Sequence, residues 1–420
     1  MGNVPVLTIA DPDVIKTVLV KDFHLFVDRH VMFTKSHAFR ALNLDRLTGD
    51  HWKRVRSIVS PVFSSRSMRK MYGQVRHCLS DFTTQYLQSV ANSGVDMDLR
   101  YAFSRYTLDV ISRTAFATKI DIYNKEMDAN NPFVANTQQF FRFNAVKEAA
   151  TILLPAFVRR WLRVERSKPD KFFEDIVRGI LAKRAQQTGD QKYQDFVQLL
   201  MDARVRDRDD DELGAGNEGV EELAVTKKVL DIKVTDKRLS PDEVVAQAFS
   251  FIVTDKRLSP DEVVAQAFSF IVSGFFTSAD ILAYCGYELA LNAHIERKLY
   301  DEITGAAVDG DIPYDQLSQL PYLDAFLSEI MRHHASPLPL SRYPVTDCKL
   351  SGTDIVVRAG TQIEIPLYAI HHSDEFYESP WKFDPDRFMP ENKHKIRPYT
   401  FLPFGAGPRN CIGMRFGILE

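Results

Sequence analysis

The sequence Phe404-Gly-Ala-Gly-Pro-Arg-Asn-Cys-Ile-Gly413 places one cysteine inside a loop rich in glycine. Gly405 and Gly407 can adopt backbone conformations that other residues avoid, and the proline that follows stiffens the loop. A helix is predicted over residues 414–419, and its N-terminal amides should lower the pKa of the Cys411 thiol. We therefore expect Cys411 to be a thiolate that binds a metal, although a lone cysteine is more often buried and inert.

The pattern Phe-x-x-Gly-x-Arg-x-Cys-x-Gly resembles, position for position, the heme-binding loop of the cytochrome P-450 family. The resemblance implies that Cys411 is the axial ligand of a heme iron and donates electron density that favours cleavage of an O–O bond. It also implies that Arg409 pairs with a heme propionate. The remaining cofactor-binding positions implied in this loop are Phe404, Gly405 and Gly413.

The composition of the chain excludes several other classes of protein. Its 420 residues carry 53 Lys and Arg against 56 Asp and Glu, a net charge of −3, so the overall balance does not indicate nucleic-acid binding. The four cysteines are far apart and have neither zinc-finger nor CxxC spacing, which indicates a reducing compartment rather than a disulfide framework. The chain is long enough for one large catalytic domain covering residues 1–420.

Residues 4–9 alternate as in a short strand, and Asp11-Pro-Asp predicts a helix through Val20 with Asp11 as its N-cap. This first part has no apolar run long enough to cross a bilayer. Animal members of the family carry an N-terminal membrane helix, so the resemblance implies that the chain is truncated at this end. It also implies truncation after Glu420, because relatives continue the last helix.

Trp52 and Arg56 are four residues apart and should share one face of a helix. Alone, they indicate an amphipathic surface helix. The resemblance instead implies a helix whose indole N–H and guanidinium bind a heme propionate, and it makes Arg29 a weaker candidate for the same role.

Residues 98–117 have the apolar spacing of a buried helix, and residues 131–157 are rich in phenylalanine. Core packing accounts for the aromatic stretch, whereas the resemblance places it at the roof of a pocket for lipophilic substrates. Residues 207–222 are acidic, contain three glycines and should form a flexible loop.

Residues 235–253 recur letter for letter as residues 254–272. Each copy has a capping box with proline at the first helical position, so each should begin its own helix. Only the second copy continues into the residues that follow, and it should form the long central helix. We interpret the repeat as a duplicated or mis-joined exon, because two copies do not make a solenoid.

The segment Ser273-Gly-Phe-Phe-Thr-Ser278 is similar to the oxygen-binding stretch of the family's central helix. Gly274 and Thr277 match the family pattern, and the resemblance implies that the Thr277 hydroxyl holds a water that delivers protons. Phe276 stands where the family has an acid, which predicts poor proton delivery and leakage of reduced oxygen species. Without the cysteine loop, Gly274 and Thr277 would indicate helix packing.

Glu329 and Arg332 form an i,i+3 pair on a predicted helix, which alone would be a surface ion pair. Arg387, in Phe383-Asp-Pro-Asp-Arg-Phe, resembles the residue that completes the family's Glu-Arg-Arg triad. Arg342 occupies the place of a further propionate-binding arginine.

Residues 349–367 alternate around two glycines and predict a small sheet that contains a hairpin. The predicted fold is therefore mainly α with a minor β subdomain. Basic residues near Trp52 and before the cysteine loop are usually only a solvated face, but the resemblance implies that they dock an acidic reductase. They are Lys53, Arg54, Arg66, Arg69, Lys70, Lys393, Lys395 and Arg397.

Together these features resemble the animal drug-oxidising 3A-like clan. They imply a heme-thiolate monooxygenase that receives NADPH-derived electrons from a reductase at the cytoplasmic face of the endoplasmic reticulum membrane and oxidises a lipophilic small molecule. Two alternatives stay open. One is a heme-thiolate hydroperoxide isomerase or dehydratase, which would tolerate Phe276, and the other is a non-catalytic fragment.

Overall fold

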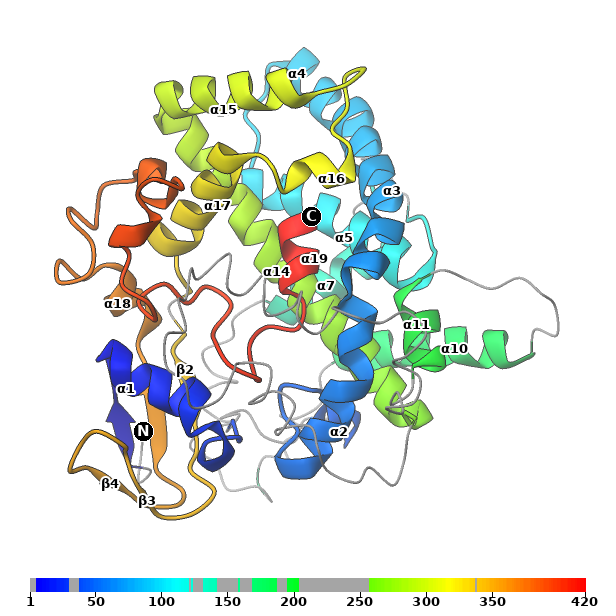
Figure 1. The fold of residues 1–420 in the computed structure, drawn as a ribbon. Helices are drawn as coiled ribbons and strands as arrows, with labels where there is room; N and C mark the ends of the chain where they lie inside the picture. The colour runs from blue at the N-terminus through cyan, green and yellow to red at the C-terminus, as the bar shows by residue number, and fades with distance from the viewer. Residues whose placement is uncertain are drawn as a thin grey trace, which may run out of the picture.

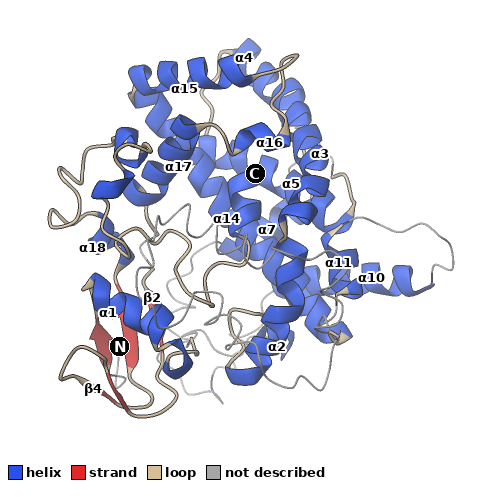
Figure 2. Ribbon diagram, viewed as in Figure 1, coloured by secondary structure: helices blue, strands red, loops and turns tan. Residues whose placement is uncertain are grey.

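The computed structural model describes residues 5–29, 38–120, 122–123, 131–141, 158, 168–186, 195–203, 257–336 and 338–420. Helices make up most of this part, and the strands gather at one side of the molecule (Figure 2). The predicted fold class, mainly α with a minor β subdomain, is confirmed. The described helices are α1 (Pro12–Lys16), α2 (Gly49–Val59), α3 (Ser65–Asp81), α4 (Gln88–Ser93), α5 (Leu99–Phe116), α7 (Pro132–Phe141), α10 (Lys168–Gln186), α11 (Phe196–Asp202), α14 (Pro260–Leu291), α15 (Ala293–Ala306), α16 (Tyr314–Leu317), α17 (Pro321–His333), α18 (Leu367–His371) and α19 (Met414–Leu419).

The long helix α14 runs through the middle of the molecule (Figure 1). It begins as predicted for the second copy of the repeat, because the Ser259 backbone N–H donates to Glu262 Oε2 at 2.8 Å and the Glu262 N–H donates to Ser259 Oγ at 3.2 Å. The first copy and the acidic stretch 207–222 lie outside the described residues. Within the part of the chain that is described, α14 is the one helix long and apolar enough to cross a membrane. It packs against α5, α10, α11 and α17, so it is a core helix of this fold.

Within the described ranges, five short strands form two sheets. β1 (Val6–Thr8) pairs in parallel with β5 (Gln362–Ile365), and β2 (Leu340–Arg342) pairs antiparallel with the other edge of β5. β3 (Cys348–Lys349) and β4 (Val356–Val357) form the second sheet. The prediction of a single sheet over residues 349–367 was therefore wrong in part. Only its first half is a hairpin, and β5 pairs instead with the N-terminal strand.

The N-terminal helix begins as predicted and ends differently. The Asp11 carboxylate accepts hydrogen bonds from the backbone N–H groups of Asp13 and Val14 at 2.8 and 3.0 Å. The α-helix ends at Lys16 and continues as a π-helical turn over Thr17–Lys21. This wider turn brings the backbone of Leu19 against the cysteine loop.

The helix predicted over residues 98–117 is confirmed as α5, with Asp98 as its N-cap, and its contact with α14 is the largest between helices. Of the aromatic stretch 131–157, only α7 lies within the described residues.

Candidate functional site

The cysteine loop is held in shape by its glycines and by backbone hydrogen bonds. Gly405 and Gly407 both have φ of +72°. The Cys411 N–H donates to the Phe404 carbonyl at 2.8 Å and closes the loop. A Cβ at position 407 would lie 1.8 Å from the Leu19 carbonyl oxygen, so only glycine allows this contact.

The Cys411 side chain is accessible to solvent, yet the protein atoms packed around it partly desolvate the thiol and raise its pKa. Three neighbours oppose that effect: the Gly413 N–H, which donates to the sulfur, and the guanidinium groups of Arg56 and Arg29. The net lowering of this pKa expected from the sequence was therefore wrong. The helix α19 that starts after Gly413 has six residues, and its dipole is too short to offset desolvation.

Several buried arginines surround this cysteine. Burial, followed by the positive charges of Arg29 and Arg409, lowers the pKa of Arg342 well below its usual range. Burial and Arg29 likewise lower the pKa of Arg409 to about 9. Arg342 is fully buried, and its Nε and Nη2 have no hydrogen-bond partner among the described residues. Buried cations without partners are costly, so this cluster fits an anionic ligand such as the two propionates of a heme.

Trp52 and Arg56 lie on the buried face of α2, as predicted, but they contact the cysteine loop. Arg56 donates to the Asn410 carbonyl at 3.1 Å and to Asn410 Oδ1 at 2.8 Å. The Arg409 guanidinium lies 4.8 Å from the centre of the Trp52 ring, and its Nη atoms donate to the carbonyls of Val27 and Leu47. The Nη atoms of Arg409 thus donate to backbone carbonyls, whereas Nε and Nη2 of Arg342 are available to a ligand.

The central helix presents two different faces near the stretch 273–278. A Cβ at Gly274 would lie 3.2 Å from Ile111 Cδ1, so this glycine allows α14 to approach α5. Phe276 is 38 % exposed, and the Thr277 hydroxyl donates to the Ser273 carbonyl at 2.6 Å. Gly274 thus has the packing contact that its residue type alone indicates, while Phe276 and Thr277 are accessible.

The side chains of Glu329, Arg332 and Arg387 lie together, between α17 and the segment that precedes the cysteine loop. Arg332 Nε and Nη2 each donate to the Glu329 carboxylate at 2.7 Å, and both side chains are fully buried. Arg387 Nε lies 3.5 Å from Glu329 Oε1, which also accepts a hydrogen bond from the Asp384 N–H at 2.9 Å. Arg332 reaches onward to the His371 carbonyl. The carboxylate therefore joins α17 to the segment before the cysteine loop.

Many of the basic residues near the loop are bound within the chain. Arg54 pairs with Glu262, and Arg69 pairs with Asp315. Lys393 and Arg397 pair with Asp324 and Asp13. Arg66 and Lys70 on α3 are exposed and form no ion pair with the described part of the chain, so their charges are more available to a partner than that of Arg54.

Asn410, which accepts two hydrogen bonds from Arg56, was not predicted as a site residue. No local signal predicts it, because its partner lies roughly 350 residues earlier in the chain. His333 and His334 were not predicted as site residues either, although the sequence shows two consecutive histidines after Arg332 on a predicted helix.

Comparison with known proteins gives consistent matches. A family model described as Cytochrome P-450 matches residues 1–232 and 242–420, and the residues between them include the start of the first repeat copy. Cytochrome P-450 3A12 of Canis lupus familiaris is 31% identical over 428 residues, which cover 100% of this chain and 75% of that protein. Thromboxane-A synthase of Sus scrofa is 31% identical over 443 residues, 100% of this chain and 76% of that protein. Cytochrome P-450 6k1 of Blattella germanica is 31% identical over 423 residues, with 99% and 74% covered.

Proposed function

Because this chain belongs to the cytochrome P-450 family of oxidoreductases, we propose that it is a heme-thiolate monooxygenase that inserts one oxygen atom from O2 into a lipophilic small molecule. The observation that carries the proposal is the group of buried arginines around an accessible cysteine, because it fits a dianionic cofactor with a thiolate ligand. When bound, the heme supplies the one-electron and O2 chemistry.

The side chains of the chain have distinct roles in this proposal. Cys411 ligates the iron, and the Gly413 N–H together with Arg56 favours the thiolate form. Arg342 receives the propionates with its two unpartnered donors, while Arg409 and Trp52 brace the loop. Thr277 holds a water for proton delivery, because its hydroxyl donates to the Ser273 carbonyl and can still accept a hydrogen bond from that water.

Replacing Cys411 with serine is expected to abolish the thiolate-type carbon monoxide difference spectrum of the reduced protein, because an alcohol does not ligate the iron as a thiolate does. Product formation should fall by more than about 100-fold. Cys348→Ser is the matched control, since this thiol is half-buried on a strand of the hairpin and should leave the spectrum unchanged. A thiolate signal that survives in Cys411→Ser would refute the assignment.

Phe276 favours a second candidate function, because it leaves the stretch 273–278 of α14 without an acid. A heme-thiolate hydroperoxide isomerase or dehydratase needs no external reduction. One of the relatives is named thromboxane-A synthase. Product formation from an organic hydroperoxide without NADPH, together with no turnover when NADPH and reductase are supplied, would favour this function over the monooxygenase.

Replacing Phe276 with glutamate is expected to increase the product formed per NADPH oxidised several-fold, because a carboxyl group can relay protons beside Thr277. The measurement is product against NADPH consumption and hydrogen peroxide release. Phe276→Gln is the control, because it introduces a polar side chain without an acid. It should increase the product formed per NADPH oxidised less than Phe276→Glu does. Equal coupling in both variants and in the unmodified protein would remove this account of Phe276.

We also propose that an acidic reductase docks beside α3 at the cytoplasmic face of the endoplasmic reticulum membrane. The Arg66→Ala/Lys70→Ala double variant should slow the first electron transfer by about 3- to 10-fold at low ionic strength, with a smaller effect in high salt. Stopped-flow reduction measures this rate. Lys349→Ala/Arg358→Ala removes the same charge at the β3–β4 hairpin and serves as the control, and equal slowing by both would refute this docking surface.

A further inference from the structure

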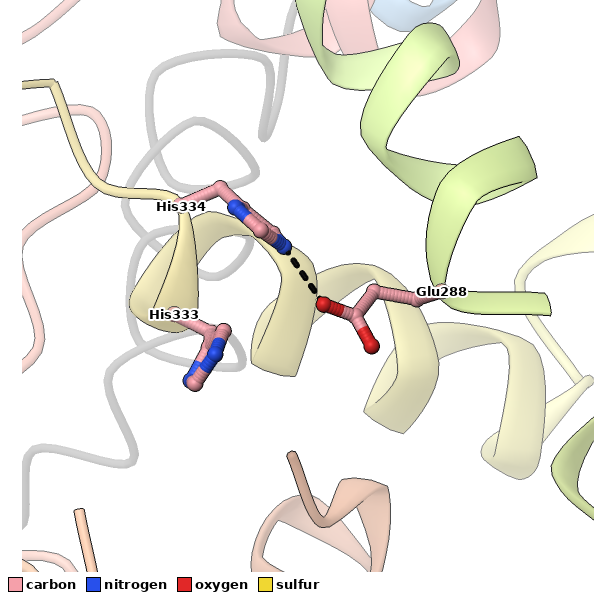
Figure 3. Close-up of side chains that lie close together, drawn as sticks. All are labelled: Glu288, His333 and His334. Atoms are coloured by element: carbon pink, nitrogen blue, oxygen red, sulfur yellow. Dashed lines mark hydrogen bonds and ion pairs between the residues drawn. The ribbon is translucent and has the colours of Figure 1, made fainter. Parts of the chain in front are cut away.

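Glu288, His333 and His334 lie together where the end of α14 meets the end of α17 (Figure 3). Each offers one ligand atom, and these atoms all lie within 4.8 Å of one another. In the described residues this is the one group of three histidine, cysteine or acidic side chains close enough to hold a metal ion. None of the three belongs to the cysteine site.

The backbone explains why neighbouring histidines can converge. Consecutive side chains in a helix point about 100° apart and do not normally share a ligand. His333 is the last residue of α17, and His334 leaves the helix with φ −104° and ψ 40°. This break turns the His334 ring toward Glu288, as Figure 3 shows.

Glu288 and His334 are held in place by each other and by neighbouring groups. Glu288 Oε1 lies 2.7 Å from His334 Nε2, and the Asn292 side-chain amide donates to Glu288 Oε2 at 3.1 Å. The Tyr284 ring stacks on His334 with centroids 4.0 Å apart and planes 7° apart. Such surrounding contacts orient ligand side chains before a metal arrives.

The charges near His333 are compatible with a cation. Arg332 Nη2 lies 3.3 Å from His333 Nδ1, but the Glu329 carboxylate, which pairs with Arg332, balances the charge of that guanidinium. Glu288 is buried and supplies one negative charge to the site itself. A divalent ion there would replace a buried hydrogen bond by stronger coordination.

Two imidazoles and one carboxylate form a nitrogen-rich set that suits Zn²⁺ and similar transition metals, whereas Mg²⁺ and Ca²⁺ prefer oxygen ligands alone. Bonds of about 2.0 to 2.1 Å in a tetrahedron require ligand atoms roughly 3.3 Å apart. The Glu288–His334 contact must therefore open slightly, and His333 must swing inward. Both are side-chain rotations.

We propose that Glu288, His333 and His334 bind Zn²⁺ or a similar divalent transition metal, with water as the fourth ligand, and thereby join α14 to α17. This site does not depend on the proposed oxygenase activity. α17 also carries Glu329 and Arg332, so the metal would fix the helix that anchors the segment before Cys411.

Calorimetric titration of the chelator-treated full chain with ZnCl2 tests the proposal. One equivalent should bind, and His334→Ala and Glu288→Gln should each weaken binding by more than about 100-fold, because losing a ligand costs at least as much as losing a residue that supports one. His294→Ala, at an exposed histidine on α15, should bind as the unmodified chain does. Zn²⁺ should also raise the Tm of the unmodified chain and of His294→Ala only.

Because the Cys411 thiol can itself bind zinc, the titration is repeated in a Cys411→Ser background. Co²⁺ gives a second reading without any ligand variant: imidazole and carboxylate ligands produce visible bands without thiolate charge-transfer absorption. Zinc binding that disappears with Cys411 but survives His334→Ala would overturn the proposal. Absence of binding in the unmodified chain would overturn it as well.

Discussion

Replacing Glu329 with alanine is expected to lower the free energy of unfolding by about 3 to 5 kcal/mol, because it leaves buried guanidinium groups without their counter-charge. Arg332 is fully buried and loses both 2.7 Å hydrogen bonds, and Arg387 loses its ion pair. The Asp384 N–H loses its acceptor too. Urea denaturation followed by circular dichroism measures the change, provided that the transition is reversible.

An exposed pair in the same chain provides the control. Arg69 and Asp315 are 58% and 64% exposed, so solvent screens their ion pair and Asp315→Ala should change the free energy of unfolding much less than Glu329→Ala does. If Glu329→Ala and Asp315→Ala shifted the urea midpoint equally, the buried triad would not stabilise the fold in the way that its geometry indicates.

Replacing Gly407 with alanine is expected to displace the cysteine loop and to lower the free energy of unfolding by about 3 to 5 kcal/mol. The residue has φ of +72°, and an added Cβ would lie 1.8 Å from the Leu19 carbonyl oxygen. A side chain at positive φ costs of order 1 to 3 kcal/mol, and forced overpacking against backbone adds about 1 to 3 kcal/mol. Thermal unfolding and the yield of heme-loaded protein measure the two consequences.

Gly405→Ala separates conformational strain from the steric clash. Gly405 has the same φ, but the nearest atom to an added Cβ lies 3.7 Å away. Only the conformational cost should remain, about 1 to 3 kcal/mol. Equal losses in the two variants would show that the contact with Leu19 adds nothing.

The features that could be predicted from the sequence are those set by local spacing. The helix-capping residues Asp11 and Ser259 follow from short-range hydrogen bonding. The fold class and family follow from the pattern around Cys411, whose glycines are fixed by backbone geometry. The meeting of Glu329, Arg332 and Arg387 was inferred from resemblance, and the structure brings these three side chains together.

The features that could not be predicted depend on distant parts of the chain. The pKa of the Cys411 thiol depends on how deeply the fold buries it, and no residue near Cys411 in the sequence predicts that burial. The carbonyl groups that bind Arg409 come from Val27 and Leu47, far away in sequence. Gly274 fits both oxygen binding and helix packing by residue type, and only its distance to Ile111 shows the packing contact.

The parallel pairing of β1 with β5 has a consequence for synthesis on the ribosome. Val6 pairs with Gln362, so roughly 350 residues must emerge before the N-terminal strand meets its partner. At about 5 to 20 residues per second, that wait is on the order of 20 to 70 s. The nascent strand therefore stays open to wrong pairings during that time, and the sheet that contains Arg342 on β2 is completed only after β5 has emerged.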